Sequence, residues 1–462
     1  MLATDILRHR GFKNLWLGQL ISQIGDSLYF VVFMFMVKKI TGNDAMVGLV
    51  GACETLPYVL FGPSAGVLAD KFDRKRIMWL SDIASGTFLL SLGALVFLAP
   101  TTPVWLLAST AFVMSTLRAV FLPAKSAAIP ALVPAAELLK ANSFSTATQN
   151  MVPIIGLGLS AGVLSLLYNL DPKLFFAVTI SLNSLTFFGS AIFVAKLPKL
   201  LPQRDEEHKV SGWREFREGI KYILSRAELK ALMGLSLALN LMISPFFVIY
   251  LAANDKWFGG RPETVAILEL TFFVGMVFAS FWVASLNVRR VGIGYIVGLA
   301  VCGATVMPFA LGPEVGPFLA RMADSMGWQG TSEWALKQTV VLGIVFVGLL
   351  NFAAGLSVPF AQIPTNTFIQ VTTPDALRGR VNSVLVTMSI GVMPIGYGLG
   401  GVLLEKLGVV AMFLIMGGGM MVVALTGLLI RPFRLATIPG NLDGSEPLPE
   451  APVGALPQEA AV

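Results

Sequence analysis

The sequence has few of the residues on which most enzymes and disulfide-rich secreted domains depend. It contains 2 cysteines and 2 histidines in 462 residues. Cys53 and Cys302 lie inside apolar segments, where they form neither a disulfide framework nor the paired spacing of a zinc site. His9 and His208 lie in polar segments. We therefore expect no metal, no cofactor and no nucleophile–base pair, and the protein is not expected to be an enzyme.

Charged residues are also scarce. They make up 13% of the chain, about half of what a soluble domain carries, whereas hydrophobic residues make up 55%. The net charge is +6, but the basic residues lie between apolar segments rather than on one soluble face, so nucleic acid is not an expected partner. The composition predicts an all-α integral membrane protein.

Twelve apolar segments are long enough to cross a bilayer, which takes roughly 20 helical residues. They are expected near residues 14–38, 45–69, 77–99, 103–122, 141–168, 172–196, 229–253, 263–286, 292–313, 338–360, 380–404 and 409–431. With the N-terminus in the cytoplasm, the cytoplasmic segments hold 25 of the 33 Lys and Arg residues and the outer loops hold 8. Because positive residues concentrate in cytoplasmic loops, both termini are expected in the cytoplasm, with the chain in the cytoplasmic (inner) membrane.

A polar stretch divides these spans into two sets. Residues 1–196 form the expected N-terminal six-helix bundle, and residues 229–434 form the C-terminal one. Residues 197–228 are expected to be a cytoplasmic linker that contains an amphipathic helix at the membrane interface. The apolar residues that recur at helical spacing in it are Trp213, Phe216, Ile220, Ile223 and Leu224. The tail, 435–462, is rich in Pro, Gly and Glu and is expected to be disordered.

The two halves repeat one another. Pro134, Ala136, Asn142, Ser143, Gly156 and Gly158 fall on Pro374, Ala376, Asn382, Ser383, Gly396 and Gly398 at one constant shift. This match pairs the fifth predicted span with the eleventh, and these glycines, with Gly162, are expected to allow close helix packing. Two pseudo-symmetric six-helix bundles around a central cavity are typical of transporters, because rocking one bundle against the other alternates access.

After the second predicted span the chain reads Gly66-Val-Leu-Ala-Asp70-Lys71-Phe-Asp73-Arg74-Lys75-Arg76. Glycine permits close packing near a helix end, an aspartate can face the positive end of a neighbouring helix, and the basic cluster can pair with carboxylates. This segment resembles the loop motif of the major facilitator superfamily, Gly-x-Leu-Ala-Asp-Arg-x-Gly-Arg-Lys, with lysine at position 71 and aspartate at position 73. The resemblance implies that Gly66, Asp70, Lys71, Arg74 and Lys75 form a gating motif.

Further stretches resemble the drug-exporter branch of this superfamily that is related to macrolide and siderophore efflux proteins. They are residues 12–19 with 22–26, residues 129–134 with 141–142, and residues 374–381. The resemblance covers most of the chain from about 10 to 430. It implies a twelve-helix fold, a cavity lined largely by spans one, four, seven and ten, and proton-driven export, and it names no substrate. The antiporter motif of the fifth span is incomplete, because Leu157 follows Gly156 where that motif has proline.

Asp26 lies near the middle of the first predicted span, on one polar stripe with Gln19, Ser22 and Tyr29. An ionisable group in hydrocarbon is costly and therefore indicates a function. Because the cost falls on the charged form, such a carboxylate suits the exchange of a proton for a cationic substrate. The alternative is a structural carboxylate that is hydrogen-bonded to a neighbouring helix.

Other polar residues in the spans complete the candidate proton- and substrate-binding set. Glu54, midway along span two, either carries charge for transport, sits at the cavity rim or pairs with a basic residue of a loop. Glu269 either joins it in transport or reaches lipid headgroups. Arg118 resembles the buried span-four arginine that the superfamily links to proton coupling, with snorkelling to the surface as the alternative. Asn240 and Asn351 either line the cavity or hold helices together.

These features predict a secondary active transporter that exports amphipathic or cationic small molecules in exchange for protons by alternating access. Its expected partners are a small-molecule substrate, protons and the lipid bilayer, and we expect a monomer. Two other cargoes stay open, a lysophospholipid-like lipid and a siderophore. An alternative of another class is a receptor or scaffold that moves no substrate and tolerates Asp26→Asn.

Overall fold

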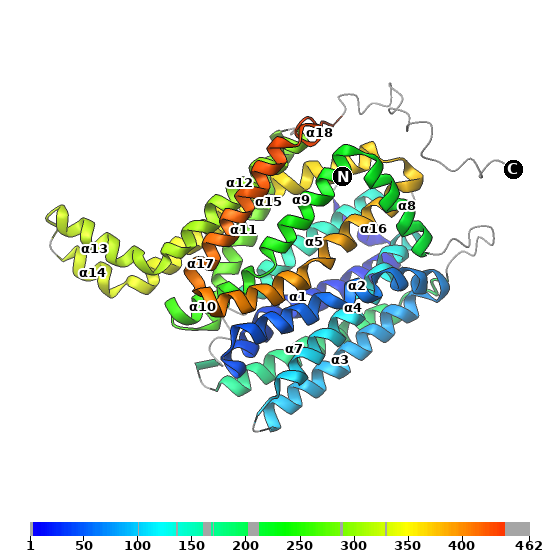
Figure 1. The fold of residues 1–462 in the computed structure, drawn as a ribbon. Helices are drawn as coiled ribbons and strands as arrows, with labels where there is room; N and C mark the ends of the chain where they lie inside the picture. Colours follow the sequence, from blue (N-terminus) through cyan, green and yellow to red (C-terminus); the bar gives the residue numbers. More distant parts are fainter. Residues whose placement is uncertain are drawn as a thin grey trace.

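Long helices packed side by side make up the structure, which is a computed structural model of the chain (Figure 1). The structure describes residues 3–99, 101–134, 137–159, 168–169, 171–201, 212–286, 290–328 and 330–438. Within these ranges the only β-type pairing is an isolated bridge between Arg290 and Thr437. The predicted all-α fold is confirmed.

In the described part of the N-terminal half most of the helices are long. They are η1 (Ala3–Arg8), α1 (Arg10–Thr41), α2 (Asp44–Lys71), α3 (Arg74–Leu98), α4 (Val104–Leu132), α5 (Leu138–Leu159) and α7 (Pro172–Ala195). Polar residues fix several helix starts: the side-chain oxygen of Asn43 accepts a hydrogen bond from the Met46 N–H, and Asp171 caps α7 in the same way. Such caps satisfy N–H groups that have no partner within the helix.

The C-terminal half has more elements, because some of its helices are interrupted. They are α8 (Gly212–Ser225), α9 (Ala227–Ile243), α10 (Phe246–Trp257), α11 (Pro262–Leu286), α12 (Val291–Val306), η4 (Met307–Glu314), α13 (Val315–Ser325), α14 (Thr331–Lys337), α15 (Thr339–Thr372), α16 (Asp375–Gly391), α17 (Met393–Leu429) and α18 (Arg431–Arg434). The helices α13 and α14 form a hairpin that extends beyond the bundle at the left of Figure 1.

In the described part of the chain, ten segments are long and apolar enough to cross a bilayer. One of them, Leu377–Leu429, has 53 residues. That is about 80 Å of helix, more than twice the thickness of the hydrocarbon core. It bends at Gly408, whose φ of 80° is readily adopted only by glycine, so this segment accounts for two predicted spans. The chain is thus multi-pass, and the total of twelve spans stays a prediction.

Several helix ends differ from the sequence-based expectation. The helix α4 continues through Pro123 to Leu132, and α15 continues to Thr372, because a proline removes one helical hydrogen bond without always ending the helix. The predicted seventh span is divided at Pro245 into α9 and α10. The α13–α14 hairpin was not predicted.

The linker helix α8 lies against the C-terminal half. Its apolar side chains Tyr222 and Ile223 are buried in the core of that half. Arg380 of α16 donates to Glu218 Oε2 at 2.5 Å and lies 3.5 Å from Glu215 Oε1. The predicted amphipathic helix therefore packs part of its apolar face, including Ile223, against protein, while Leu224 is 50% exposed. Its contact with the membrane interface stays a prediction.

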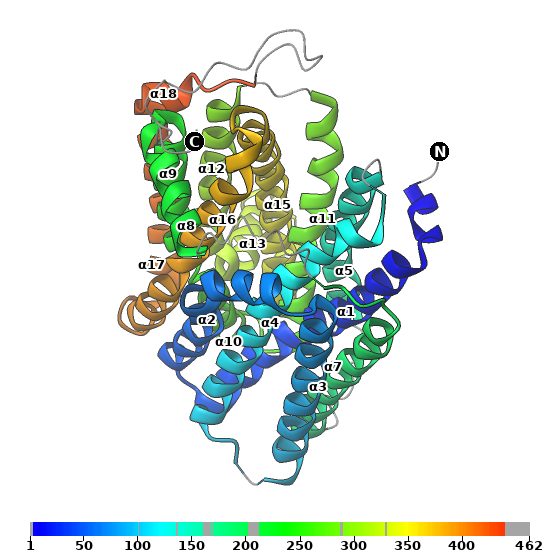
Figure 2. The ribbon, with the colours of Figure 1, turned by 90° about the vertical axis from the view of Figure 1, so that its right-hand side faces the viewer.

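Three clusters of buried apolar side chains show how the two halves meet. The largest contains residues of both halves, such as Phe33 of α1 and Tyr250 of α10, and lies toward the end that carries the α13–α14 hairpin, which we call the hairpin end. We call the opposite end, where α8 and α18 lie (Figure 2), the termini end. There the two halves have separate clusters. Met78 belongs to the cluster of the N-terminal half and Phe433 to that of the C-terminal half. The apolar cores of the two halves are therefore joined at the hairpin end and separate at the termini end, where α2 still contacts α8 and α16.

Two glycines related by the internal repeat make equivalent close contacts. A Cβ atom on Gly156 of α5 would lie 3.0 Å from the carbonyl oxygen of Ile24 in α1. A Cβ atom on Gly396 of α17 would lie 2.7 Å from the carbonyl oxygen of Leu241 in α9. The first and fifth helices of each half therefore approach at a glycine in both halves, which is the small-residue packing common in membranes.

The other glycines of the predicted packing set do not share this contact. A Cβ atom on Gly158 or on Gly398 would meet no atom within 4 Å. Gly162 lies outside the described residues.

We expect Gly396→Ala to lower the melting temperature of the purified protein, because the added methyl group would collide with the Leu241 carbonyl and the Ser244 hydroxyl. Overpacking of this kind costs about 1–3 kcal/mol. Gly398→Ala is the matched control: its methyl group enters open space, and alanine favours the helix by about 1 kcal/mol, so its melting temperature should stay equal or rise. Equal losses in both variants would contradict the contact.

Candidate functional site

A cavity of about 610 Å³ lies between the helices and extends along α1 from Gln19 to Val31. The charged residues in its wall are Asp26, Glu54, Asp82, Arg118, Lys125 and Glu269. The uncharged polar residues in its wall are Gln19, Ser22, Gln23, Ser27, Tyr29, Thr55, Tyr58, Ser81, Ser85, Ser115, Gln149 and Tyr397. The structure thus brings together six of the eight residues in the predicted binding set.

An ion pair between Asp26 and Arg118 lies in this wall. Arg118 Nη2 donates to Asp26 Oδ2 at 2.5 Å, and Asn183 Nδ2 donates to Asp26 Oδ1 at 3.4 Å. The Arg118 side chain is 45% exposed and that of Asp26 is 19% exposed, so the pair faces the cavity. The carboxylate therefore links α1, α4 and α7 while it stays open to a ligand or to water.

The carboxylates of Glu54 and Glu269 face the same cavity from α2 and α11. Among the described residues, neither makes a hydrogen bond or ion pair through its side chain, although Ser115 donates to the backbone carbonyl of Glu54. The sequence left open whether Glu269 reaches lipid headgroups, and the structure places it in the cavity wall beside Phe273.

The structure does not place Asn240 or Asn351 in the cavity wall. Asn240 Nδ2 donates to the Ser236 carbonyl of its own helix at 2.8 Å. Asn351 is 1% exposed and donates to Tyr250 Oη at 2.5 Å and to the Leu268 carbonyl at 3.0 Å. Of the two alternatives weighed for Asn351, the contacts support the one in which it holds helices together.

Two charged residues in the wall were missed by the sequence analysis. Asp82 of α3 is 2% exposed and accepts a hydrogen bond from Ser190 Oγ at 2.7 Å. Asp26 was selected because it is a carboxylate inside an apolar span. Asp82 meets the same criterion, so the sequence analysis could have found it. Lys125 lies beyond the end of the predicted span 103–122, yet α4 continues through Pro123 and carries it into the cavity wall.

The wall comes mainly from the N-terminal half. The C-terminal half contributes Glu269, Phe273, Met393 and Tyr397, from α11 and α17. The resemblance implied that spans seven and ten line the cavity, but the lining contains no residue of α9, α10 or α15. The reason is that much of α10 and parts of α15 are buried in the core that both halves share.

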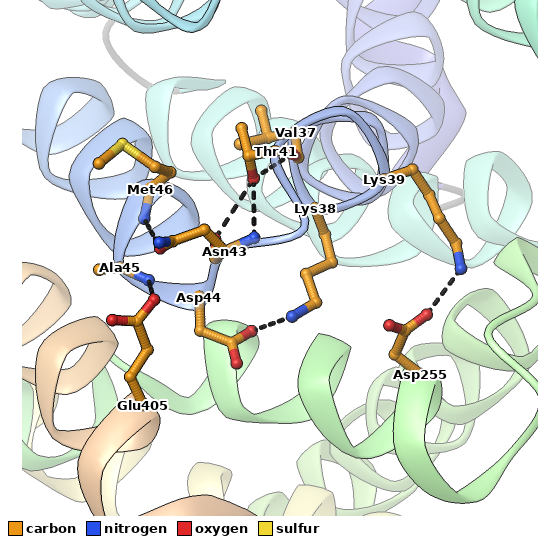
Figure 3. A network of polar contacts seen from close by, with 10 residues as sticks. All are labelled: Val37, Lys38, Lys39, Thr41, Asn43, Asp44, Ala45, Met46, Asp255 and Glu405. Atoms are coloured by element: carbon orange, nitrogen blue, oxygen red, sulfur yellow. Dashed lines mark hydrogen bonds and ion pairs between the residues drawn. The ribbon is translucent and has the colours of Figure 1, made fainter.

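Polar contacts between the halves close the hairpin end (Figure 3). Lys39 Nζ at the end of α1 lies 2.6 Å from Asp255 Oδ1 of α10. The backbone N–H of Ala45, at the start of α2, donates to Glu405 Oε1 of α17 at 3.4 Å. These contacts lie beside the core that both halves share at this end.

The gating motif makes its described hydrogen bonds to other residues of the N-terminal half. Arg74 Nη1 donates to the Ala127 carbonyl of α4 at 3.0 Å. Asp73 caps α3 and accepts hydrogen bonds from the N–H groups of Lys75 at 3.0 Å and Leu200 at 3.1 Å. Its φ of −59° suits any residue, so the turn does not need the glycine of the family motif. Lys71 ends α2 and is exposed, and the side chains of Gly66 and Asp70 lie outside the described residues.

The model of the Major Facilitator Superfamily matches residues 15–388. The chain belongs to this superfamily. Structural comparison agrees: a nucleoside transporter, NupG (D323A mutant), superposes with a TM-score of 0.64 over 91% of this chain and 99% of that one, at 13% identity. At that identity the likeness shows the fold alone.

Sequence relatives lie in the efflux branch that the motifs indicated. Macrolide efflux protein A of Streptococcus pyogenes is 25% identical over 428 residues, which cover 92% of this chain and 96% of the relative. The enterobactin exporter EntS of Escherichia coli O1:K1 / APEC is 24% identical over 449 residues, which cover 94% and 96%. The resemblance to macrolide and siderophore efflux proteins is confirmed, and these relatives are transporters.

We expect charge reversal at the hairpin end to open it. Lys39→Glu places a negative charge beside Asp255, and partly exposed ion pairs of this kind are worth about 0.2–1 kcal/mol, so the open population should rise up to about fivefold. The measurement is the labelling rate of a cysteine at Phe30→Cys by an impermeant maleimide added at the hairpin end, in a background without Cys53 and Cys302.

The double reversal Lys39→Glu with Asp255→Lys is the control for this test. It restores the attraction with the charges exchanged and should return the labelling rate toward that of the wild type. A double reversal that labels as fast as the single variant would rule out a role of the pair in closure.

Proposed function

We propose that the protein is a proton-coupled secondary active exporter of amphipathic or cationic small molecules that works by alternating access. The observation that carries this proposal is the Asp26–Arg118 pair, which faces a cavity between two halves whose apolar cores are joined at one end and separate at the other. A charged group at this depth of a membrane is costly and is kept where it serves transport. Both a proton and a cationic cargo can neutralise the Asp26 carboxylate.

Proton and cargo would compete for Asp26 and act on the helices through Arg118. While Asp26 is charged, its bonds to Arg118 and Asn183 hold α1, α4 and α7 together. A proton on the carboxylate removes most of its attraction for the guanidinium, so the contact between α1 and α4 weakens. Glu54 and Glu269 would supply further negative charge for the cargo, with Gln19 and Ser22 as hydrogen-bonding partners.

In alternating access, the cavity would be closed first at one end of the protein and then at the other. Here the shared core and the Lys39–Asp255 pair close the hairpin end. In the opposite state these contacts would part and the termini end would close. We infer that the gating motif latches that closed end through Gly66, Asp70, Lys71, Arg74 and Lys75.

We further infer that the termini end faces the cytoplasm and that the protein acts as a monomer in the cytoplasmic (inner) membrane. The excess of Lys and Arg in the segments of the termini end supports this orientation. The cavity would then open to the cytoplasm, which is the state in which an exporter takes up its cargo.

Asp26→Asn is expected to abolish exchange, because the amide cannot carry the charge that proton and cargo share. In inverted vesicles energised by a proton gradient, wild type should accumulate a lipophilic fluorescent cation. The variant should lose at least about tenfold in initial rate, because the neutral amide removes the charge that faces the cavity and that proton and cargo exchange.

Glu333→Gln is the control, since it removes an acidic charge from an exposed site on α14. It should leave the rate unchanged. Equal transport by wild type and Asp26→Asn would reject Asp26 as the coupling group. Absence of flux with any cargo would favour a receptor or scaffold.

Lys125 supports a second cargo class. Its side chain is 6% exposed, faces the cavity, and makes no hydrogen bond or ion pair with another described residue. A buried ammonium group without a partner attracts an anionic group. We infer that a lysophospholipid-like or siderophore-like cargo would place its phosphate or other anionic group at Lys125, and that a zwitterion would also use Asp26.

Lys125→Gln separates the two cargo classes. The glutamine should lower transport of a zwitterionic lysophospholipid about tenfold or more, because the buried charge that attracts the phosphate is gone, while transport of the lipophilic cation is retained. Both rates are measured in the same vesicle preparation. Equal effects on the two cargoes would reject an anion-binding role.

A further inference from the structure

The α13–α14 hairpin interrupts the repeat between η4 and α15 and projects from the hairpin end of the C-terminal half (Figure 1). Gly327 and Gly330, with φ of 73° and 87°, form the turn between its helices. The hairpin lines no part of the cavity, so the transport cycle described above assigns it no role.

The inside of the hairpin is packed with small residues. Gly316, Ala320 and Ala323 of α13 and Ala335 of α14 are buried. A Cβ atom on Gly316 would collide with Thr339, so the base of α13 lies tightly against the start of α15. Small residues let the two helices approach closely and leave the larger apolar side chains of α13 outside.

Those larger side chains form one exposed face of α13. Phe318 and Met322, together with Met326 at the C-cap of α13, follow one another at four-residue spacing and are 54%, 38% and 55% exposed. On the helix surface such residues are neighbours, so they form a continuous apolar stripe. Asp324 lies on the opposite side of α13, with Arg321 between the two faces.

The rest of the hairpin carries tryptophans. Trp328 beside the turn and Trp334 on α14 are 61% and 53% exposed. Exposed tryptophans together with an amphipathic helix are typical of protein segments that lie at the boundary between lipid and water.

The length of the preceding segment puts the hairpin at that boundary. Val291–Ser325 is one apolar segment of 35 residues, about 52 Å of helix, whereas the hydrocarbon core is about 30 Å thick. Roughly 20 residues from Val291 reach Leu311, so α13 begins where the hydrocarbon ends. Leu311 and, at the start of α15, Val340 and Val341 are exposed, which makes the apolar face of the hairpin continuous with the lipid-facing surface of the spans.

We propose that the α13–α14 hairpin lies on the bilayer surface at the hairpin end and inserts its Phe318–Met322–Met326 face into the boundary between headgroups and acyl chains. The partner is the lipid of the surrounding leaflet. To bind the lipid surface, the hairpin needs an apolar stripe, tryptophans and a polar opposite face, and it has all three. This inference does not depend on the cargo or on proton coupling.

The test measures which face of α13 the lipid covers. In a background without Cys53 and Cys302, an environment-sensitive fluorophore is attached at Met322→Cys or, as the matched control on the opposite face, at Asp324→Cys. The full-length protein is placed in nanodiscs that hold one copy. Iodide should quench the label at 322 at least about threefold less than the label at 324, and a lipid with a nitroxide near the headgroup should quench 322 more.

One-copy nanodiscs contain neither a second copy nor another protein. If the label at position 322 is protected from iodide there, the protection comes from lipid. Equal iodide quenching at both positions would overturn the proposal. Protection of 322 that appears only at high protein density would point to a second copy, and protection only in native membranes would point to a partner protein; both results would also overturn it. If Met322→Cys does not fold, Phe318→Cys reports on the same face.

Discussion

A charge inside a bilayer is stable only where a partner or water reaches it, and the polar structure of this protein follows from that constraint. Arg118 and Asp26 neutralise each other at the cavity wall, and Asp82 is held by Ser190. The charged residues that lack a described partner, such as Lys125, face the cavity, where water or cargo can reach them. The remaining span surface can then stay apolar, as contact with lipid requires.

The two halves have equivalent helix contacts, but most of the charged residues of the cavity wall lie in one of them. The glycine contacts at Gly156 and Gly396 are equivalent, as the internal repeat requires. The cavity charges, in contrast, come from the N-terminal half except for Glu269. The C-terminal half contributes α10 to the shared core at the hairpin end, and its Asn351 makes structural hydrogen bonds. One half thus carries the polar wall, and the other provides a mostly apolar surface against which it can move.

The sequence predicted the helical membrane fold and most of the cavity charges, because hydropathy and buried carboxylates are strong local signals. It placed Asp26, Glu54, Arg118 and Glu269 in one set, and the structure brings them into one cavity. It missed Lys125 because a proline inside a helix and a proline at a helix end look alike without tertiary contacts. The α13–α14 hairpin was also missed, since its short helices lie in a loop, where apolar periodicity is brief. Contacts between the halves, such as Lys39 with Asp255, depend on distances that one sequence does not contain.

The docking of α8 has a mechanical consequence. Asp73 and Arg74 hold Leu200 to the N-terminal half, whereas Arg380 holds α8, which begins at Gly212, to the C-terminal half. Only the residues between these two anchors connect the halves covalently at this point. Eleven residues span at most about 40 Å when fully extended. This tether sets an upper limit on how far the two halves can separate at the termini end, whatever the size of the cargo.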